Sequence, residues 1–182
     1  GNNRLGRAIR FFTEVTTQIP SIVMGVFVFS LFLELATANV VSRRIVYSTI
    51  SGMLALAVIM IPFIARTTDE ALRLVPASTR EAALALGIPK YRVTLRIVLS
   101  SSSSALLTGV LLAFARAAGE TAPLLMTALG NNFGFAGLDQ PIESMTHTIY
   151  TFALAPQPSL HQSAWGAALI LTGMMLLLSI AT

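Results

Sequence analysis

The chain has 182 residues, of which 54% are hydrophobic and only 11% are charged. Soluble domains carry about 25% charged residues, so the composition excludes an ordinary soluble domain and favours a polytopic membrane protein. The net charge of +4 does not indicate a nucleic-acid partner, because the eleven arginines and the single lysine sit mostly beside apolar runs and form no basic stripe. Without cysteine, the chain forms neither disulfides nor thiolate sites.

Four apolar segments approach or exceed the roughly 20 residues that a helix needs to cross a bilayer. They run from about Ile19 to Ala38, from Ile45 to Ala65, from Ser101 to Leu129 and from Ser163 to Ala181. These segments predict an all-α fold, a helical bundle of membrane spans that occupies residues 1–182 as a single domain.

The basic residues predict how the spans are oriented. Three arginines precede the first span and six basic residues lie within residues 66–96, whereas the opposite side carries only Arg43 and Arg44. Basic residues concentrate on the cytoplasmic side of membrane proteins. We therefore expect a cytoplasmic region at residues 66–99 and an extracytoplasmic loop at residues 130–162. The loop has no Lys or Arg, is rich in Gly and Asn, and reads as a short amphipathic helix after Pro141.

The most informative segment runs from Ser78 to Gly87, between the second and third spans. Ser78 and Glu81 match the S-x-x-E capping box, in which the serine hydroxyl accepts from the amide three residues later. Gly87 predicts the end of this helix, and Pro89 predicts the start of a second helix that continues into the third span. The short capped helix either docks on another protein or only connects two spans.

A spaced motif in this segment resembles the E-A-A motif of ABC importer permeases: Glu81, Ala82, Ala83 and Gly87, followed by the I-x-L of residues 97–99. The resemblance implies that the short helix is a coupling helix, which docks into a cleft of an ATP-binding subunit. A nucleotide-binding P-loop requires G-x-x-x-x-G-K-[ST], whereas the only lysine, Lys90, follows a proline. We therefore expect ATP and Mg²⁺ on separate ATPase subunits, with no cofactor and no catalytic residue in this chain.

The third span carries two charges beside a stripe of small residues that lets another helix approach closely. The small residues recur every four positions: Ser101, Ala105, Gly109, Ala113 and Ala117. At about 100° per residue, Arg116 and Glu120 fall on or beside this stripe, away from lipid. Two interpretations remain open. Arg116 and Glu120 form an i,i+4 pair that locks helix packing, or Arg116 offers its guanidinium to an oxyanion in a translocation path.

Stretches over most of the chain are similar to one subgroup, the second membrane subunit of phosphate-uptake ABC importers. They comprise residues 20–25, 66–70, 72–76, 115–125 and 138–141. The resemblance implies that Arg116 and Arg66 line the phosphate path, with Glu120 as the partner of Arg116. For Arg66, at the end of a span, the alternative is anchoring at the cytoplasmic interface.

The resemblance also implies partners and a location. The partners are a homologous permease subunit, ABC ATPase subunits, an extracytoplasmic phosphate-binding protein and the lipid bilayer of the bacterial inner membrane, with no nucleic acid. Inorganic phosphate is the expected cargo. The alternatives are a permease for another oxyanion such as molybdate or sulfate, a membrane scaffold or sensor that transports nothing, and a passive channel.

The sequence departs from the family in two places. The motif normally closes with proline after I-x-L, whereas Leu99 is followed by five serines. A serine hydroxyl can bond to the carbonyl one turn earlier, so a helix remains possible and the kink before the span is left open. Members of the family usually have six spans, so four spans imply that two more precede Gly1 and that the chain is truncated.

Three polar residues of the outer loop, Asp139, Glu143 and His147, follow one another at intervals of four and superficially suggest a metal site. A fourth ligand would require His161 to fold back. We therefore expect a solvated loop face and no metal.

Overall fold

The computed structural model describes residues 4–131 and 134–181, so Asn132 and Phe133 of the outer loop lie outside the described residues. Within these ranges the chain is helical, with one isolated bridge between Leu129 and Ile142 and no strand. The predicted all-α fold is confirmed. In chain order the elements are α1 (Arg4–Gln18), α2 (Ser21–Thr37), the 3-10 helix η1 (Arg43–Val46), α3 (Thr49–Arg73), α4 (Ala77–Ala85), α5 (Lys90–Arg92), the π-helix η2 (Val93–Val98), α6 (Leu99–Ser101), α7 (Ser103–Ala118), α8 (Ala122–Thr127), α9 (Met145–Ala153) and α10 (Pro158–Ala181).

Two helices, α3 and α10, are each long and apolar enough to cross a membrane. Two bent pairs pass the same test together: α1 with α2, bent by 104°, and Lys90–Ser101 with α7, bent by 67°. Counting each pair as one span gives up to four, the number predicted, and the chain is a multi-pass membrane protein. Some boundaries differ from the prediction, since α3 continues past Ala65 to Arg73 and an entire helix, α1, precedes the first predicted span.

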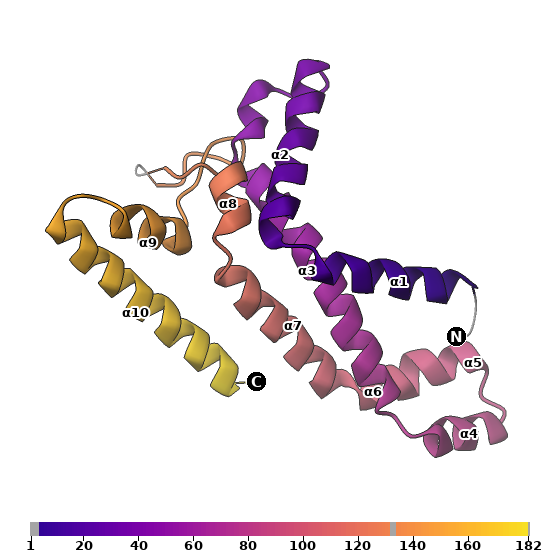
Figure 1. Ribbon diagram of the computed structural model, residues 1–182. Helices are drawn as coiled ribbons and strands as arrows, with labels where there is room; N and C mark the ends of the chain where they lie inside the picture. The colour runs from indigo at the N-terminus through magenta and orange to yellow at the C-terminus, as the bar shows by residue number, and fades with distance from the viewer. Residues whose placement is uncertain (1–3, 132–133, 182) are drawn as a thin grey trace.

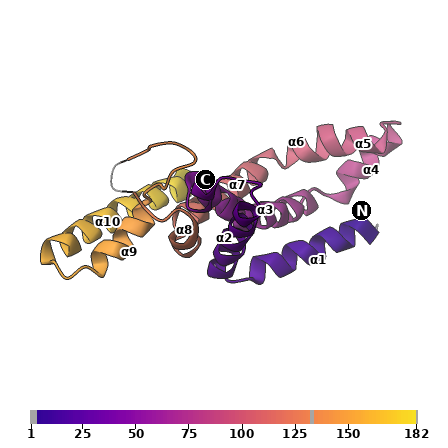
Figure 2. The ribbon, with the colours of Figure 1, turned by 90° about the horizontal axis from the view of Figure 1, so that it is seen from above.

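The helices form an elongated molecule with two distinct ends (Figure 1). Helix α7 packs along α3, α8 packs against α2 and α3, and α9 packs on α10. Helices α4 to α6 lie beyond the lower end of α3, while the loop after α8 lies at the opposite end of that helix (Figure 1). Seen from above, α9 and α10 form one extremity and α1, α4 and α5 the other (Figure 2).

An apolar core cluster lies where α2, η1 and α3 meet. Its buried apolar residues come from α2, η1 and α3: Val28, Phe32, Ala36, Val46 and Ala55. Gly25 of α2 allows α8 to come close, because a Cβ at this position would lie 2.6 Å from the Cα of Pro123. Only glycine fits at this position, because the atom that a Cβ would meet belongs to the main chain of α8 and cannot turn aside as a side chain could.

The first turn of α3 is stabilised by the loop that follows α8. The amide of Thr49 donates to the carbonyl of Gln140 at 2.9 Å, and the amide of Ile50 donates to that of Leu138 at 3.1 Å. The hydroxyl of Ser48 accepts from the amide of Ser51 as an N-cap. The otherwise unsatisfied amides at this helix start are thus paired inside the protein, and the loop is held against the end of α3.

The helix after α4 begins at Lys90 with Pro89 as its N-cap, one residue later than predicted, and then adopts π-helical turns in η2. Bonding between residues five apart brings Val93 and Val98 to one side, where both are buried. At Ser102 the helix bends by 67° into α7. The Ser102 hydroxyl donates to the carbonyl of Val98 at 2.9 Å, so the serine bonds back as expected and also occupies the kink.

Candidate functional site

Helix α4 carries the E-A-A motif and starts at Ala77, directly after Pro76. The predicted capping box is wrong, because no side chain caps this helix. Pro76 is extended, with φ −56° and ψ 143°, and serves as the N-cap in place of Ser78. Ser78 therefore lies inside the first turn, from which its hydroxyl does not reach the amide of Glu81.

The end of α4 agrees with the sequence. Gly87 has φ +75°, a left-handed conformation that favours glycine. Its amide donates to the carbonyl of Leu84 at 2.9 Å, and the amide of Ile88 donates to that of Ala83 at 3.3 Å. These two bonds form a Schellman motif, so the predicted stop at Gly87 is confirmed.

The two sides of α4 have different surroundings. Ala83 is buried in an apolar cluster with Val75, Val93 and Val98, and the Arg80 guanidinium donates to the carbonyl of Leu72 at the end of α3. The opposite side is open, with four motif or neighbouring residues exposed: Glu81, Ala82, Leu84 and Leu86. The E-A-A motif is therefore divided between one residue that seats the helix on η2 and two that face outward.

The predicted span over Ser101 to Leu129 is not one helix. Helix α7 ends at Ala118 with Gly119 as its C-cap, and α8 starts at Ala122 with proline in its first turn. Glycine is a poor helix former, and Pro123 has no amide to continue the i,i+4 bonding. Glu120 therefore lies in a break between two helices, which we call the α7–α8 junction, residues 119–121.

The junction brings Arg116 and Glu120 together, with Arg116 Nε 3.5 Å from Glu120 Oε1. This pair, expected from the i,i+4 spacing, is at the long limit for a hydrogen bond. The Glu120 side chain is only 15% exposed, whereas that of Arg116 is 47% exposed. Only Nε of Arg116 has a hydrogen-bond partner among the described residues, so both terminal amino groups of its guanidinium are available to a ligand.

Two contacts at the junction were not foreseen from the sequence. The Arg116 guanidinium lies 5.5 Å from the centre of the Phe63 ring of α3, a cation–π arrangement. The Thr146 hydroxyl of α9 donates to the main-chain carbonyl of Glu120 at 3.1 Å. Both partners are distant in sequence, so neither periodicity nor spacing within the third span indicates them.

The small-residue stripe is partly buried as expected. Gly109, Ala113 and Ala117 are buried, and a Cβ on Gly109 would lie 2.8 Å from the hydroxyl of Thr67 on α3. Ser101 and Ala105 are exposed instead. Both lie close to the bend at Ser102, so they do not share the buried face of α7 with the other residues of the stripe.

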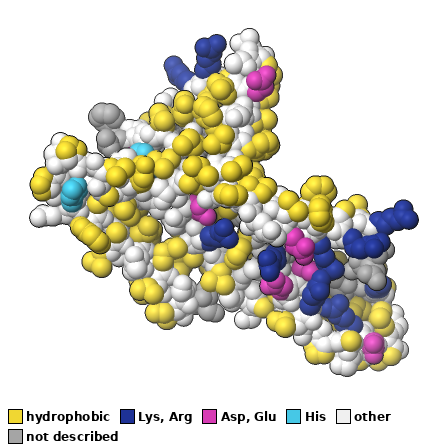
Figure 3. All heavy atoms as spheres, in the orientation of Figure 1, with side chains coloured by type: hydrophobic (Ala, Val, Ile, Leu, Met, Phe, Trp, Pro, Cys, Tyr) yellow, Lys and Arg dark blue, Asp and Glu magenta, His cyan; other side chains and the backbone are white. Residues whose placement is uncertain are grey.

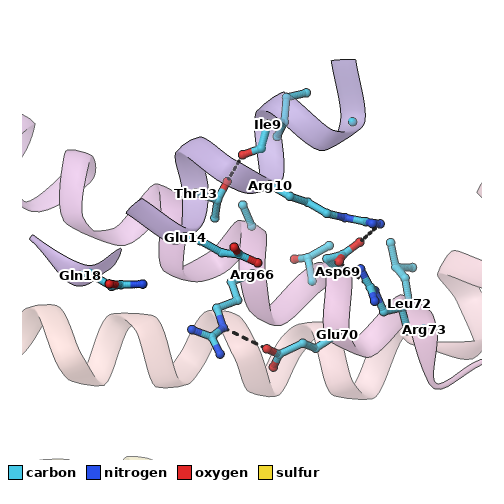
Figure 4. Close-up of a pocket in the computed structure, with 13 residues that line it drawn as sticks. Ile9, Arg10, Thr13, Glu14, Gln18, Arg66, Asp69, Glu70, Leu72 and Arg73 are labelled. Carbon is cyan, nitrogen blue, oxygen red and sulfur yellow. Dashed lines mark hydrogen bonds and ion pairs between the residues drawn. The ribbon is translucent and has the colours of Figure 1, made fainter. Parts of the chain in front are cut away.

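Arg66 lies on α3 one turn beyond Phe63 and pairs with Glu70, with Nε 3.0 Å from Oε1. Among the described residues, no ion pair joins it to Arg116 or Glu120. Arg66 lines a cavity of about 580 Å³ between α1 and α3. Figure 4 shows Arg66 and Glu70 on one side of α3, while Asp69 points toward Arg10 of α1. Arg66 is thus near the junction along α3 but belongs to a separate polar cluster.

The outer-loop residues do not align on one helix, because α9 begins only at Met145. His147 Nδ1 lies 2.6 Å from Glu143 Oε1, and the carboxylate of Glu143 also accepts from Thr148 and from the amide of Asn131. The pair is partly buried, so the predicted solvated face is wrong for these two residues. Over residues 4–131 and 134–181, no three His, Asp or Glu side chains are grouped to hold a metal ion.

Comparison with known proteins agrees with this architecture. Residues 1–182 match the family described as binding-protein-dependent transport system inner membrane component. The phosphate transport system permease protein PstA of Xylella fastidiosa (strain 9a5c) is 42% identical over 98% of this chain and 60% of that protein. That of Haemophilus influenzae is 41% identical over 99% of this chain and 61% of that protein. The probable counterpart in Methanocaldococcus jannaschii is 34% identical over 93% of this chain and 58% of that protein.

The chain spans about three fifths of the length of these curated relatives. No solved structure matches it. The resemblance to importer permeases that the E-A-A motif indicated is confirmed by a family match over the whole chain. The chain belongs to the family of inner membrane components of binding-protein-dependent transport systems.

Proposed function

We propose that the chain forms half of the translocation path in an ATP-driven importer of inorganic phosphate in the bacterial inner membrane. The observation that carries the proposal is Arg116, half exposed at the α7–α8 junction with both terminal amino groups free of hydrogen bonds to the described residues. Relatives named phosphate transport system permease proteins support phosphate as the cargo.

The chemistry of the junction suits an oxyanion. The planar guanidinium of Arg116 offers a fork of donors that matches two oxygens of phosphate. Its contact with Glu120 is long, at 3.5 Å, so a phosphate can displace the carboxylate with little loss of interaction free energy. Glu120 then faces the bound anion as an acceptor. A carboxylate accepts from the P–OH of a protonated phosphate but only repels sulfate, which carries no proton at neutral pH. The pair therefore favours phosphate over sulfate.

The exposed side of α4 is the proposed contact with the ATPase subunits, which would hold ATP and Mg²⁺. Glu81, Ala82 and Gly87 would contact the ATPase, while Ala83 transmits its movement to η2 through the buried cluster. From η2 the movement passes the bend at Ser102 into α7, whose last turn carries Arg116. A homologous permease subunit would supply the other half of the path, and an extracytoplasmic binding protein would deliver phosphate.

The distribution of charge supports the predicted orientation, with residues 66–99 in the cytoplasm and the loop at residues 130–162 outside. Figure 3 shows the Lys and Arg side chains gathered mainly over the arm formed by α1, the end of α3 and α4 to α6. Arg66 belongs to this arm, where it lines the cavity beside α1. In the proposed importer it is one of three arginines, with Arg10 and Arg73, that line the path toward the cytoplasm.

The test is transport by the complete complex, reconstituted in vesicles with its partner subunits and supplied with ATP. Radiolabelled phosphate should accumulate, and unlabelled sulfate and molybdate should compete poorly. Arg116→Gln removes a charged hydrogen-bonding group worth about 3 kcal/mol, which corresponds to about 100-fold slower uptake. The matched control is Arg43→Gln at an exposed site in η1, outside the α7–α8 junction, which should leave uptake unchanged.

The same assay separates the alternatives. A scaffold or sensor would show no ATP-dependent flux, and a passive channel would equilibrate phosphate without ATP. A permease for another oxyanion would accumulate molybdate or sulfate in preference to phosphate. Glu120→Gln should reduce the preference for phosphate over sulfate, because the neutral amide of glutamine no longer repels sulfate. An unchanged preference would contradict the role of Glu120.

A further inference from the structure

Helix α1 is amphipathic, and its two faces have different surroundings. Its polar face, with Arg10, Thr13 and Glu14, lines the cavity against α3. On the other side, four large apolar side chains are 43% to 74% exposed: Leu5, Phe11, Phe12 and Val15. At about 100° per residue, these four gather around the direction opposite to the cavity. The other described residues therefore leave an apolar helix face uncovered.

The orientation of α1 follows from two fixed features. The chain bends by 104° between α1 and α2, so α1 is nearly perpendicular to the span that follows it. Arg10 Nη2 lies 2.9 Å from Asp69 Oδ1, and Asp69 Oδ2 lies 2.9 Å from Arg73 Nε. Asp69 thus joins α1 to the last turn of α3. A helix held perpendicular to its own span runs along the membrane plane.

The uncovered face of α1 points to the same side as the span α2 that follows it. Figure 1 shows α2 rising from one side of α1, with the end of α3, α4 and α5 on the other. The cavity-lining face of α1 looks toward the end of α3, so the face with Phe12 looks the way α2 rises. In Figure 3, this edge of the arm carries hydrophobic side chains near α2 and Lys or Arg side chains toward its outer end. At about 100° per residue, Arg7 lies at the boundary of the apolar face, and Arg4 lies on it at the start of the helix.

We propose that α1 is a membrane-surface helix that binds the lipids of one leaflet. Phe11, Phe12 and Val15 insert at the boundary of headgroups and acyl chains, as apolar faces of interfacial helices do. Arg4 and Arg7 contact anionic headgroups, for which their charge is complementary. Through Asp69 the membrane surface is then joined to the turn of α3 that leads into α4. The proposal requires a membrane but is independent of which cargo the complex moves.

The absence of cysteine from the chain makes site-directed spin labelling a direct test. Phe12→Cys and Val15→Cys place labels on the apolar face, and Glu14→Cys is the matched control on the polar face. Leu169→Cys, on the exposed side of α10, gives a lipid-facing reference. The complete complex, with cysteine-free partner subunits, is placed in vesicles of phosphatidylethanolamine and phosphatidylglycerol. Accessibility is measured to oxygen, which enters lipid, and to a water-soluble nickel complex.

We expect the labels at positions 12 and 15 to have a several-fold higher ratio of oxygen to nickel accessibility than the label at position 14. Their ratio should approach that at position 169. Labels shielded from both reagents would show that a protein partner covers the face, and labels open to nickel would show a face in water. Either result overturns the proposal. Using two positions, with complex assembly checked by size exclusion, avoids reliance on one variant.

A second arm tests the headgroup contacts. In the Phe12→Cys background, Arg4→Gln with Arg7→Gln should raise nickel accessibility at position 12 in vesicles that contain phosphatidylglycerol. The same change should have little effect in vesicles of phosphatidylcholine alone. The matched control is Arg43→Gln with Arg44→Gln near η1, which should change nothing in either lipid. Equal effects of the α1 variant in both lipids would contradict recognition of anionic headgroups.

Discussion

The coupling helix α4 and the α7–α8 junction both interrupt the helical chain, but they are stabilised in different ways. Helix α4 is completed locally, by Pro76 at its start and by the Schellman bonds around Gly87 at its end. The junction depends on distant segments. The carbonyl of Glu120 accepts from Thr146, 26 residues away, and Pro123 packs against Gly25 of α2.

This difference corresponds to the two proposed functions. A helix that is pushed by a partner must move as a unit. Local stabilisation of both its ends makes this possible. A binding group in a translocation path must instead keep its place relative to several helices, so its surroundings are supplied by α2, α3 and α9. Substitutions should therefore have local effects in α4 and long-range effects at the junction.

The largest effect is expected from a substitution that disturbs the distant contacts of the α7–α8 junction. Gly25→Ala places a Cβ 2.6 Å from a main-chain atom of Pro123, so α8 must move away from α2. Overpacking of this kind costs about 3 kcal/mol, and displacing α8 should also reduce phosphate uptake. Thermal unfolding of the detergent-solubilised complex measures the first effect and vesicle transport the second.

The matched control is Gly166→Ala in α10, where no atom lies within 4 Å of the added Cβ. This substitution should be neutral or slightly stabilising, because alanine is the better helix former. If Gly25→Ala behaved in the same way, the close packing of α8 on α2 would not hold the junction.

The next effect distinguishes the two sides of α4. Ala83→Leu adds volume to the cluster with Val75, Val93 and Val98 and should cost about 2 kcal/mol. It should also weaken stimulation of the ATPase, since the seat of α4 is disturbed. Ala82→Leu, on the exposed side of the same helix, is the control and should leave thermal unfolding unchanged. A larger loss of stability from Ala82→Leu would reverse the assignment of the two faces.

The same contrast explains what the sequence predicts. The end of α4 at Gly87 was predictable because turn chemistry is set by residues next to one another. The i,i+4 pairing of Arg116 with Glu120 was predictable for the same reason. The start of α4 was placed incorrectly because two local signals competed, and the fixed conformation of Pro76 prevailed over the capping potential of Ser78.

What the sequence did not predict depends on tertiary contacts. The break at residues 119–121 interrupts a run whose hydropathy is continuous. The sequence signals of this break are Gly119 and Pro123. Phe63 and Thr146 carry no signal of their own, because a phenylalanine in a span and a threonine in a loop are ordinary. Helix α1 is not among the predicted elements, because long apolar runs define the predicted spans and α1 is an amphipathic helix outside them.

A smaller effect is expected where α9 meets the junction. Thr146→Val keeps the shape of a buried side chain but removes the donor to the carbonyl of Glu120. Loss of the hydrogen bond to this partly buried carbonyl costs about 1 kcal/mol, and a looser Glu120 should reduce phosphate affinity more than maximal rate. The control is Thr151→Val, whose exposed hydroxyl donates to carbonyls of α9 itself, those of His147 and Thr148. Equal phosphate affinities for the two variants would separate α9 from the proposed site.

The smallest effect tests whether α4 is stabilised only by its own ends. Gly87→Ala forces a residue with a Cβ into φ +75°, which costs about 1 kcal/mol, although no atom lies within 4 Å of the added carbon. The strain should appear as faster hydrogen exchange of the last amides of α4, with α7 and α8 unchanged. Gly87→Asn should lose less, because asparagine tolerates this conformation better. If exchange also accelerated at the α7–α8 junction, the two regions would be coupled even without ATP, and α4 would not be a locally completed unit.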